Sequence, residues 1–293
     1  MSKLDKALQR AMHKKETGKS DREQFPATDK MTKAMDKSKN NRYKTEIAVL
    51  GVAKKKVQDN EIRPSYTRTE VLIPDGKILE SNRIMTHLKD PRVRDYYDIV
   101  RTRVFQQTRS KGWNSLMVTS VYPDEGKTLT AINLGLSIAR QMQHTALLVG
   151  ANFRSPKICK YFGFEENRAG LSDYLTQNAQ VENLLFNPGI DKMVILPTGK
   201  EMIATDDLGS PRMKNLVEEL KYKYPDRYVI YDCPHILDMP DTLIFSSYVD
   251  AVLIVVKAGQ TPGHKIREAV QTLEEQGVNI VGMVLNKAES GMR

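Results

Sequence analysis

"VTSVYPDEGKTLTAINL", residues 118–134, joins an apolar run to an amphipathic pattern through a short loop that ends in Gly-Lys-Thr. Backbone N–H groups of such a loop converge on phosphate oxygens at the positive end of the following helix. The lysine then reaches the β- and γ-phosphates, and the Ser/Thr hydroxyl binds Mg²⁺. We therefore predict a phosphate-binding loop. Its predicted nucleotide contacts are Glu125, Gly126, Lys127, Thr128 and Leu129.

The first half of the loop departs from the motif. Val121 stands where the motif has its first glycine, and Asp124 stands where a second glycine is common. Aspartate adopts positive φ more readily than most residues, but its carboxylate is expected to bring negative charge towards the phosphates. The sequence thus predicts a phosphate site with an altered loop.

Apolar runs and helical patterns alternate along the chain from residue 91. Continuous apolar strands indicate burial on both faces, hence a parallel sheet with flanking helices. We predict an α/β fold with a mostly parallel sheet flanked by helices, whose ligand binds at the carboxyl ends of the strands. The predicted strands are 115–121, 145–151, 192–198, 227–233, 251–258 and 279–286, and the predicted helices include 92–107, 127–142, 210–223 and 262–276.

Composition divides the chain into two parts. Of the net charge of +9, residues 1–60 carry +8, from 16 basic and 8 acidic residues, which leaves about +1 for the rest. A neutral folded part with a basic appendage argues against a specific nucleic-acid-binding domain. We predict a basic, largely disordered arm over residues 1–90, long and polar, and a folded domain over residues 91–293.

An amphipathic pattern at Ser2–Lys14 opens the arm. It predicts a short helix that docks on a partner or an anionic membrane surface, and a fraying helix without a role explains it equally well. The chain has two cysteines without metal-site spacing and no run long enough to span a bilayer. These features predict a cytoplasmic protein, peripheral at the inner face of the plasma membrane.

A second element of a nucleotide site follows the strand at 227–233. Asp232 stands at its carboxyl end, before a turn with Pro234. An acid at the end of a buried strand is costly without a partner, which favours a functional role. We therefore expect Thr128 and Asp232 to hold the metal ion, and Lys127 and Asp232 to form the catalytic set.

With these residues identified, the chain from about residue 93 to 288 resembles the cytoplasmic domain of bacterial protein-tyrosine kinases (BY-kinases) of capsule and exopolysaccharide systems. These are relatives of the MinD and ParA P-loop ATPases. The resemblance rests on "TSVYPDEGKT", "LLVGANFRSP", "GLSDYL", "VILPTG", "SPRMKNLVEEL" and "VIYDCPHILDMPDTLIF". It implies ATP or ADP with Mg²⁺ as cofactor and a membrane co-polymerase, or chain-length protein, as partner. It also allows self-association.

The resemblance carries over to particular residues. Lys127 and Thr128 match the phosphate-binding lysine and the metal-binding hydroxyl, and Asp232 matches the acid of the second metal motif. Arg154 matches the arginine of the family's L-L-x-D-x-D-x-R segment. Asn286 and Lys287 fall in the "LNK" that neighbours the nucleotide base.

Four departures concern the chemistry and the assembly. Gly150 and Asn152 replace both acids of the D-x-D pattern, and neither can accept a proton from tyrosine. Asp124 replaces the loop glycine, and the chain ends without the family's tyrosine cluster, since its last tyrosine is Tyr248. The family's subunit-contact pattern E-x-x-R-x-x-R becomes Asp-x-x-Asp-x-x-Arg at 95–101, which puts a family-type ring in doubt.

These departures predict a regulator of polysaccharide export that binds ATP with weak or lost kinase activity, a pseudokinase. Two other functions stay open. One is a positioning ATPase of the MinD/ParA type, although that group has a signature lysine early in its loop, where this chain has Tyr122. The other is a nucleotide-free scaffold on the same fold.

Overall fold

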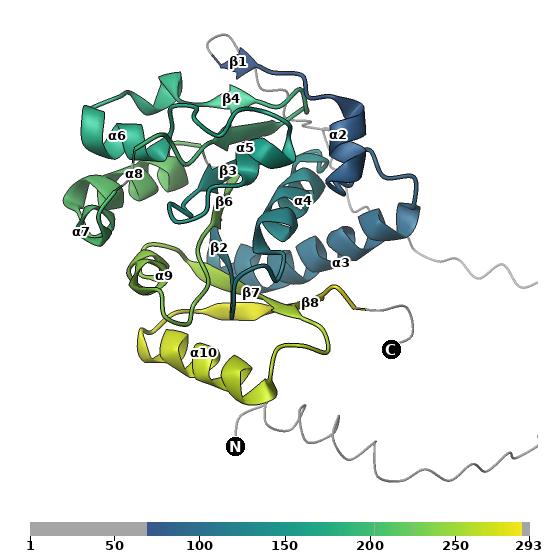
Figure 1. Ribbon diagram of the computed structural model, residues 1–293, viewed down its shortest axis with the longest axis vertical. Coiled ribbons are helices and arrows are strands. Elements are labelled where there is room, and N and C mark those ends of the chain that lie inside the picture. The colour runs from purple at the N-terminus through teal and green to yellow at the C-terminus, as the bar shows by residue number, and fades with distance from the viewer. Residues whose placement is uncertain (1–68, 202, 225, 289–293) are drawn as a thin grey trace, which may run out of the picture. The chain divides into compact units, whose positions relative to one another are not determined.

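The computed structural model describes residues 69–201, 203–224 and 226–288. Over these residues an eight-stranded sheet has the strand order β1-β4-β5-β3-β6-β2-β7-β8 (Figure 1). Its pairs are parallel except β4 with β5. The strands are β1 Glu70–Val71, β2 Ser115–Ser120, β3 Thr145–Gly150, β4 Phe186–Asn187, β5 Met193–Leu196, β6 Arg227–Asp232, β7 Ala251–Lys257 and β8 Ile280–Asn286.

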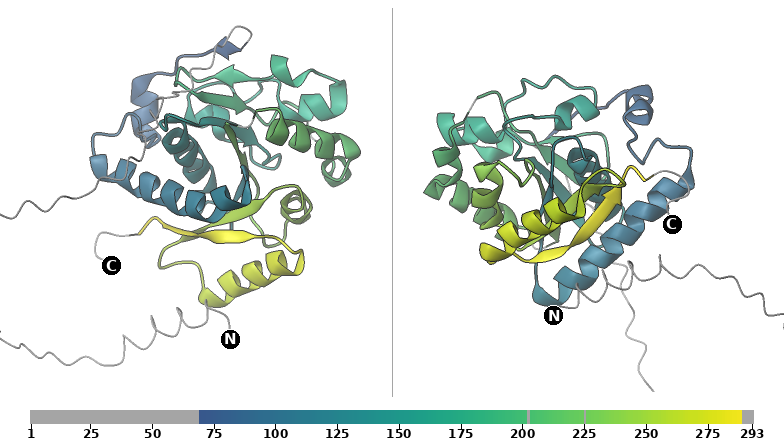
Figure 2. Two further views of the ribbon diagram at one scale, coloured as in Figure 1. Left: turned by 180° about the vertical axis from the view of Figure 1, so that it is seen from behind. Right: turned by 60° about the horizontal axis from the view of Figure 1, so that its bottom comes forward.

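Helices cover both faces of the sheet. One face packs against α2 Gly76–Ser81, α3 Pro91–Thr108, α4 Lys127–Ala139 and α5 Ile158–Tyr161. The other face packs against α6 Leu171–Gln177, α7 Thr205–Leu208, α8 Pro211–Tyr222, α9 Pro240–Ser246 and α10 Gly263–Glu275. Two 3₁₀ turns, η1 Arg109–Lys111 and η2 Val181–Asn183, complete the described elements. Figure 2 shows the edge strand β8 between α10 and α3. The predicted parallel sheet with flanking helices is confirmed.

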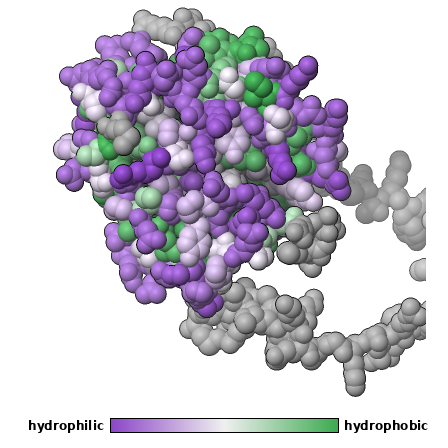
Figure 3. All heavy atoms as spheres, in the orientation of Figure 1, coloured by the Kyte–Doolittle hydropathy of each residue, from purple (hydrophilic) through white to green (hydrophobic). Residues whose placement is uncertain are grey.

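Burial explains why the central strands form. All side chains of β2, β3 and β5 are buried, which is typical of parallel strands covered on both faces. The helix after the loop, α4, is also buried on nearly all sides, because it lies between the sheet and α3. On the face of the molecule shown in Figure 3, hydrophilic residues dominate and apolar residues gather in small patches, the clearest of them near the top.

The structure differs from the predicted boundary between arm and domain. The sequence predicts residues 69–90 to be part of the largely disordered arm, yet they include β1 and α2, and Leu79, Ile84 and Met85 are buried in the core. Asn133 of α4 fixes this segment, since its Oδ1 accepts from the Met85 N–H at 2.9 Å and its Nδ2 donates to the Arg83 carbonyl at 3.1 Å. The folded domain thus begins before residue 91.

The predicted helix at Ser2–Lys14 lies outside the described residues. None of the helices that the structure describes is long and apolar enough to cross a membrane.

Candidate nucleotide-binding site

The loop between β2 and α4 lies at the carboxyl ends of the central strands. It turns sharply, with positive φ at Asp124 (57°) and Gly126 (98°). At Gly126 a Cβ atom would come within 2.0 Å of the Asn286 Nδ2 atom. Glycine is therefore required at this position for two reasons, the backbone conformation and the close approach of the "LNK" segment.

The end of β8 holds the loop from outside. Asn286 Nδ2 donates to the Glu125 carbonyl at 2.8 Å, and Lys287 Nζ donates to the Asp124 carbonyl at 2.6 Å. Peptide carbonyls in a phosphate loop have to point outward so that the N–H groups can point inward. These two contacts thus favour the orientation of the peptides that phosphate binding needs.

Glu125 holds the loop from inside. Its side chain is buried, and its carboxylate accepts from the Tyr122 N–H at 2.9 Å, from the Lys257 N–H at 3.2 Å and from the Thr261 hydroxyl. The sequence placed Glu125 among the nucleotide contacts. The structure gives its side chain a different role, because the carboxylate binds the loop and β7, the strand next to β2 in the sheet.

The Asp124 carboxylate is neutralised by a neighbouring lysine. Lys157 Nζ donates to Asp124 Oδ1 at 3.0 Å, and this contact lowers the pKa of Asp124. The Asp124 side chain is 78% exposed. The expected negative charge at the phosphates is therefore offset by Lys157 and by solvent.

Thr128 and Asp232 form the centre of the site. The Thr128 hydroxyl donates to Asp232 Oδ2 at 2.8 Å, and both residues are buried. The other carboxylate oxygen, Oδ1, is buried with no hydrogen-bond partner among the described residues. Burial raises the pKa of Asp232 to about 6, although Thr128 and Lys127 favour its charged form.

Hydroxyl and carboxylate oxygens are the ligand types that Mg²⁺ prefers. The site offers both, and one oxygen of the Asp232 carboxylate is buried without a partner among the described residues. The residues present therefore fit the metal ion, with Thr128 and Asp232 as its protein ligands. When bound with a nucleotide, Mg²⁺ neutralises phosphate charge.

A cavity of about 130 Å³ opens at Thr128, while Asp232 lies behind it and does not line the cavity. It is smaller than the typical small-molecule site of ~300–1,000 Å³, so it matches the phosphates and not a whole nucleotide. Predicted site residues that line it are Gly126, Lys127, Thr128, Leu129, Asn286 and Lys287. Sequence reasoning missed Arg83, Lys157 and Tyr161 in the same lining.

One of these missed residues had a signal in the sequence. Lys157 follows β3, and loops at the carboxyl ends of parallel strands converge on one edge of the sheet. Arg83 was overlooked because its segment was assigned to the arm.

The chain is similar in sequence and in structure to proteins of known family. No protein-family model matches the chain. The tyrosine-protein kinase CpsD of Streptococcus pneumoniae serotype 4 is 31% identical over 199 residues, which are 68% of this chain and 86% of CpsD. This chain belongs to the bacterial tyrosine-protein kinase family.

Solved structures agree with this assignment. The kinase domain of VpsO is 27% identical, with a TM-score of 0.60 over 68% of this chain and 98% of that domain. The septum site-determining protein MinD from Pyrococcus horikoshii, complexed with Mg-ADP, is 19% identical, with a TM-score of 0.51 over 60% of this chain and 72% of MinD. The MinD likeness shows a shared fold, so the predicted P-loop NTPase fold is confirmed.

The end of β3 has no carboxylate side chain. Gly150 lies directly opposite Asp232 in the pairing of β3 with β6. A Cβ atom at Gly150 would lie 2.4 Å from Thr198 Oγ1 and 2.8 Å from the Thr198 backbone nitrogen. Contacts below 3.0 Å essentially never occur for real Cβ atoms, so this position is closed to any side chain unless the backbone moves.

Asn152 also has a local role. It is buried, and its Oδ1 accepts from the Ser155 N–H at 3.2 Å, which closes a turn. It does not line the cavity described above. Neither Gly150 nor Asn152 therefore supplies a carboxylate to the site.

Arg154 lies apart from the phosphate cavity. Its Nε donates to Asp241 Oδ2 at 2.9 Å, and Asp241 also accepts from the Thr205 hydroxyl at 2.9 Å. Arg154 does not line the cavity. The structure therefore joins Arg154 to α7 and α9 and not to the loop.

The modified subunit-contact pattern on α3 is used within the chain. Asp98 Oδ1 accepts from Arg101 Nη1 at 2.7 Å and from the Ser137 hydroxyl at 2.6 Å. Arg101 Nη1 also donates to the Ser137 carbonyl at 2.9 Å. These contacts attach α3 to α4, the helix that follows the phosphate loop.

Proposed function

We propose that this protein binds a nucleotide with Mg²⁺ and has weak or lost tyrosine autokinase activity. We further propose that it acts as a regulator in exopolysaccharide or capsule biosynthesis, at the inner face of the plasma membrane, with a membrane co-polymerase as partner. A relative named as a succinoglycan biosynthesis transport protein supports the polysaccharide role, and the partner is proposed from the family resemblance. The site geometry supports nucleotide binding combined with weak or lost phosphate transfer to tyrosine.

The nucleotide-binding half of the proposal rests on groups that are present. Lys127 and Thr128 begin α4, Gly126 permits the close backbone approach, and Asp232 has a free buried oxygen. Backbone N–H groups at the start of this long helix add a favourable field for phosphate.

The loss of activity rests on one observation, the closed position of Gly150 opposite Asp232. A general base for a tyrosine hydroxyl contributes about 10²–10⁴-fold in rate. Among the residues that the structure describes, the cavity is lined by one carboxylate, Asp124, and that group is paired with Lys157. Asn152 cannot take a proton either. Phosphate binding is therefore retained while the group that would activate the acceptor is missing.

Nucleotide titration with and without Mg²⁺ tests the proposal. We expect ADP and ATP to raise the melting temperature of wild type in the presence of Mg²⁺, and an anti-phosphotyrosine blot to stay blank. Lys127→Met should abolish the shift, because it removes the buried cation. Lys77→Met, which removes an exposed lysine on α2, is the matched control and should retain it.

Three outcomes would contradict parts of the proposal. Strong autophosphorylation that Lys127→Met abolishes would show an active kinase. The absence of any shift at millimolar nucleotide would favour the nucleotide-free scaffold. A gain of phosphotyrosine in Asn152→Asp would show that one restored acid suffices, and this variant keeps the acceptor that Ser155 needs.

The partner proposal needs its own test. The tagged full chain, purified in mild detergent from its native cells, should retain a membrane polysaccharide co-polymerase that mass spectrometry identifies. Recovery without any such membrane protein, under conditions that keep the chain folded, would contradict this part.

A further inference from the structure

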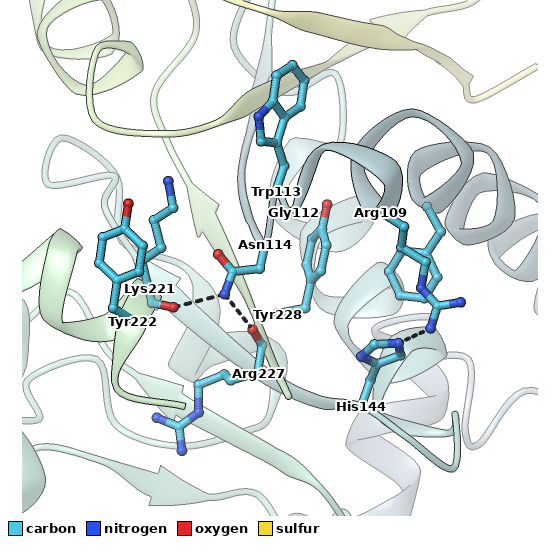
Figure 4. A pocket seen from close by; sticks show the side chains of 10 residues that line it. Arg109, Gly112, Trp113, Asn114, His144, Lys221, Tyr222, Arg227 and Tyr228 are labelled. Atoms are coloured by element: carbon cyan, nitrogen blue, oxygen red, sulfur yellow. Dashed lines mark hydrogen bonds between the residues drawn. The ribbon is translucent and has the colours of Figure 1, made fainter. Parts of the chain in front are cut away.

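A second pocket lies at the amino ends of β2, β3 and β6, the end of the sheet opposite the phosphate loop (Figure 4). Its volume is about 300 Å³. Four aromatic residues, three basic residues and no acidic residue line it. The lining consists of Phe105, Trp113, Tyr222, Tyr228, Arg109, Lys221, Arg227, Gly112, Asn114 and His144.

Part of this lining has a structural role. Asn114 Nδ2 donates to the Lys221 carbonyl at 2.9 Å and to the Arg227 carbonyl at 3.2 Å, so it joins α8 to β6 (Figure 4). The Lys221 ammonium pairs with Asp250, which is largely buried. These contacts build the pocket, and the Lys221 charge is already compensated.

Arg109 is different, because its partners carry no charge. Its guanidinium contacts the His144 ring nitrogen and lies 4.7 Å from the centre of the Phe105 ring. Burial and the nearby Arg109 lower the pKa of His144, so that this ring is neutral. The Arg109 side chain makes no ion pair among the described residues.

Lys111 adds a second cation next to the pocket. Its ammonium lies 3.9 Å from the centre of the Trp113 ring, and it too makes no ion pair within the described part of the chain. Two cations without acidic partners favour a ligand with about two negative charges, and a phosphate monoester carries about −1.5 to −2 at pH 7.

The aromatic residues provide both a rigid wall and an open ring. Phe105 packs against His144 and Tyr228, with ring centres 5.1 and 5.4 Å apart. Tyr222 is 71% exposed and faces the pocket from the end of α8 (Figure 4). An exposed ring beside cations suits the stacking of a planar group that carries an anion.

We propose that this pocket binds a small phosphorylated planar ring, either a nucleoside monophosphate or a tyrosine phosphate. The phosphate is held by Arg109 and Lys111, and the ring stacks between the aromatic side chains. The volume lies at the lower end of small-molecule sites, which suits one nucleotide or one phosphorylated side chain. The site is separate from the phosphate loop and does not depend on the function proposed above.

The chain provides its own probe, because Trp113 is its single tryptophan. Its fluorescence, excited at the red edge of its absorption, is recorded while AMP, GMP, phosphotyrosine or inorganic phosphate is added to the full chain. We expect saturable quenching by at least one ring phosphate and much weaker binding of inorganic phosphate.

Three variants assign the signal to the pocket. Arg109→Gln should weaken binding by about tenfold, since it removes a charge-assisted hydrogen-bond donor. Arg103→Gln removes the same charge from an exposed position of α3 that does not line the pocket, and it should bind like wild type. Lys127→Met, at the other end of the sheet, should also leave the Trp113 titration unchanged.

Clear outcomes would overturn the proposal. They are the absence of any saturable change at millimolar ligand, equal affinity for inorganic phosphate, and equal affinity in wild type and Arg109→Gln. If Arg109→Gln unfolds, as circular dichroism would reveal, Lys111→Gln replaces it with the same expected loss. A preference for the nucleotides or for phosphotyrosine identifies which source of the shared chemistry the pocket accepts.

Discussion

Gly150 and Asp232 face each other across neighbouring parallel strands, at the carboxyl ends of β3 and β6. The main chain of Thr198 occupies the space that a side chain at Gly150 would need. The end of β3 therefore has no room for an acidic side chain unless the backbone moves.

Gly150→Asp should destabilise the domain. Overpacking against a main-chain atom and burial of a charge next to Asp232 are expected to lower the free energy of unfolding by about 3 kcal/mol. Thr198→Ala should relieve only part of this loss, because the Thr198 backbone nitrogen remains 2.8 Å from the new Cβ. Urea denaturation measures both effects.

Gly263→Asp is the matched control for this substitution. Gly263 begins α10, and only the end of the Arg267 side chain, at 3.8 Å, lies near its missing Cβ. Aspartate in a first helical turn is favourable, so stability should stay unchanged or rise slightly. A Gly150→Asp variant as stable as this control would show that the strand end is not closed.

Asp232→Asn should separate stability from binding. An amide avoids the buried negative charge, so the variant without nucleotide should be more stable than wild type at pH 8, by up to about 3 kcal/mol. The same change should abolish the Mg²⁺-dependent part of nucleotide binding, because the metal loses its charged ligand. Calorimetry with and without Mg²⁺ measures both quantities, and Asp191→Asn, at an exposed position, should change neither.

The pH dependence of stability provides an independent check of Asp232. Its pKa is about 6 in the folded protein, against about 3.9 for an unfolded aspartate. The folded form retains the proton longer, so the contribution of this group is complete below pH ~4 and is lost as pH rises through ~6. The stability gain of Asp232→Asn should therefore be small near pH 4 and should reach its full size above pH ~7. A gain that does not change with pH would contradict the assigned titration.

Asp98 and Arg101 should be energetically coupled. Their side chains are 31% and 14% exposed, and both contact Ser137, so we expect a coupling of about 1 kcal/mol in a double-mutant cycle with alanine. Arg103 is an exposed arginine further along α3 that does not contact Asp98. The cycle of Asp98 with Arg103 should therefore give no coupling. Equal coupling in the two cycles would show that the contact with α4 contributes nothing specific.

Much of this fold is predictable from local pattern. The expected strand at 227–233 is observed at Arg227–Asp232, and the expected helix at 210–223 is observed at Pro211–Tyr222. These elements are long, apolar on the buried side and bounded by clear signals. By contrast, β1 and β4 have two residues each, and only tertiary pairing distinguishes them from loop.

The site divides in the same way. Lys127, Thr128 and Asp232 could be predicted because each lies within a short continuous stretch of sequence. Lys127 and Thr128 belong to the loop motif, and Asp232 ends an apolar strand. The internal role of Glu125 and the pairing of Arg154 with Asp241 could not, because each depends on partners that are distant along the chain. The sequence shows that Gly150 lacks an acid, but only the structure shows that Thr198 fills the space.

The contacts from Asn286 and Lys287 to the phosphate loop have a consequence for the dynamics of the site. Asn286 is the last residue of β8 and Lys287 follows it, and β8 is one of the two edge strands of the described sheet. Edge strands open by local unfolding more readily than central ones. Fraying of β8 from β7 would release the carbonyls of Asp124 and Glu125 together, even with every residue of the loop intact. The order of the nucleotide site therefore depends on how firmly the last strand stays paired.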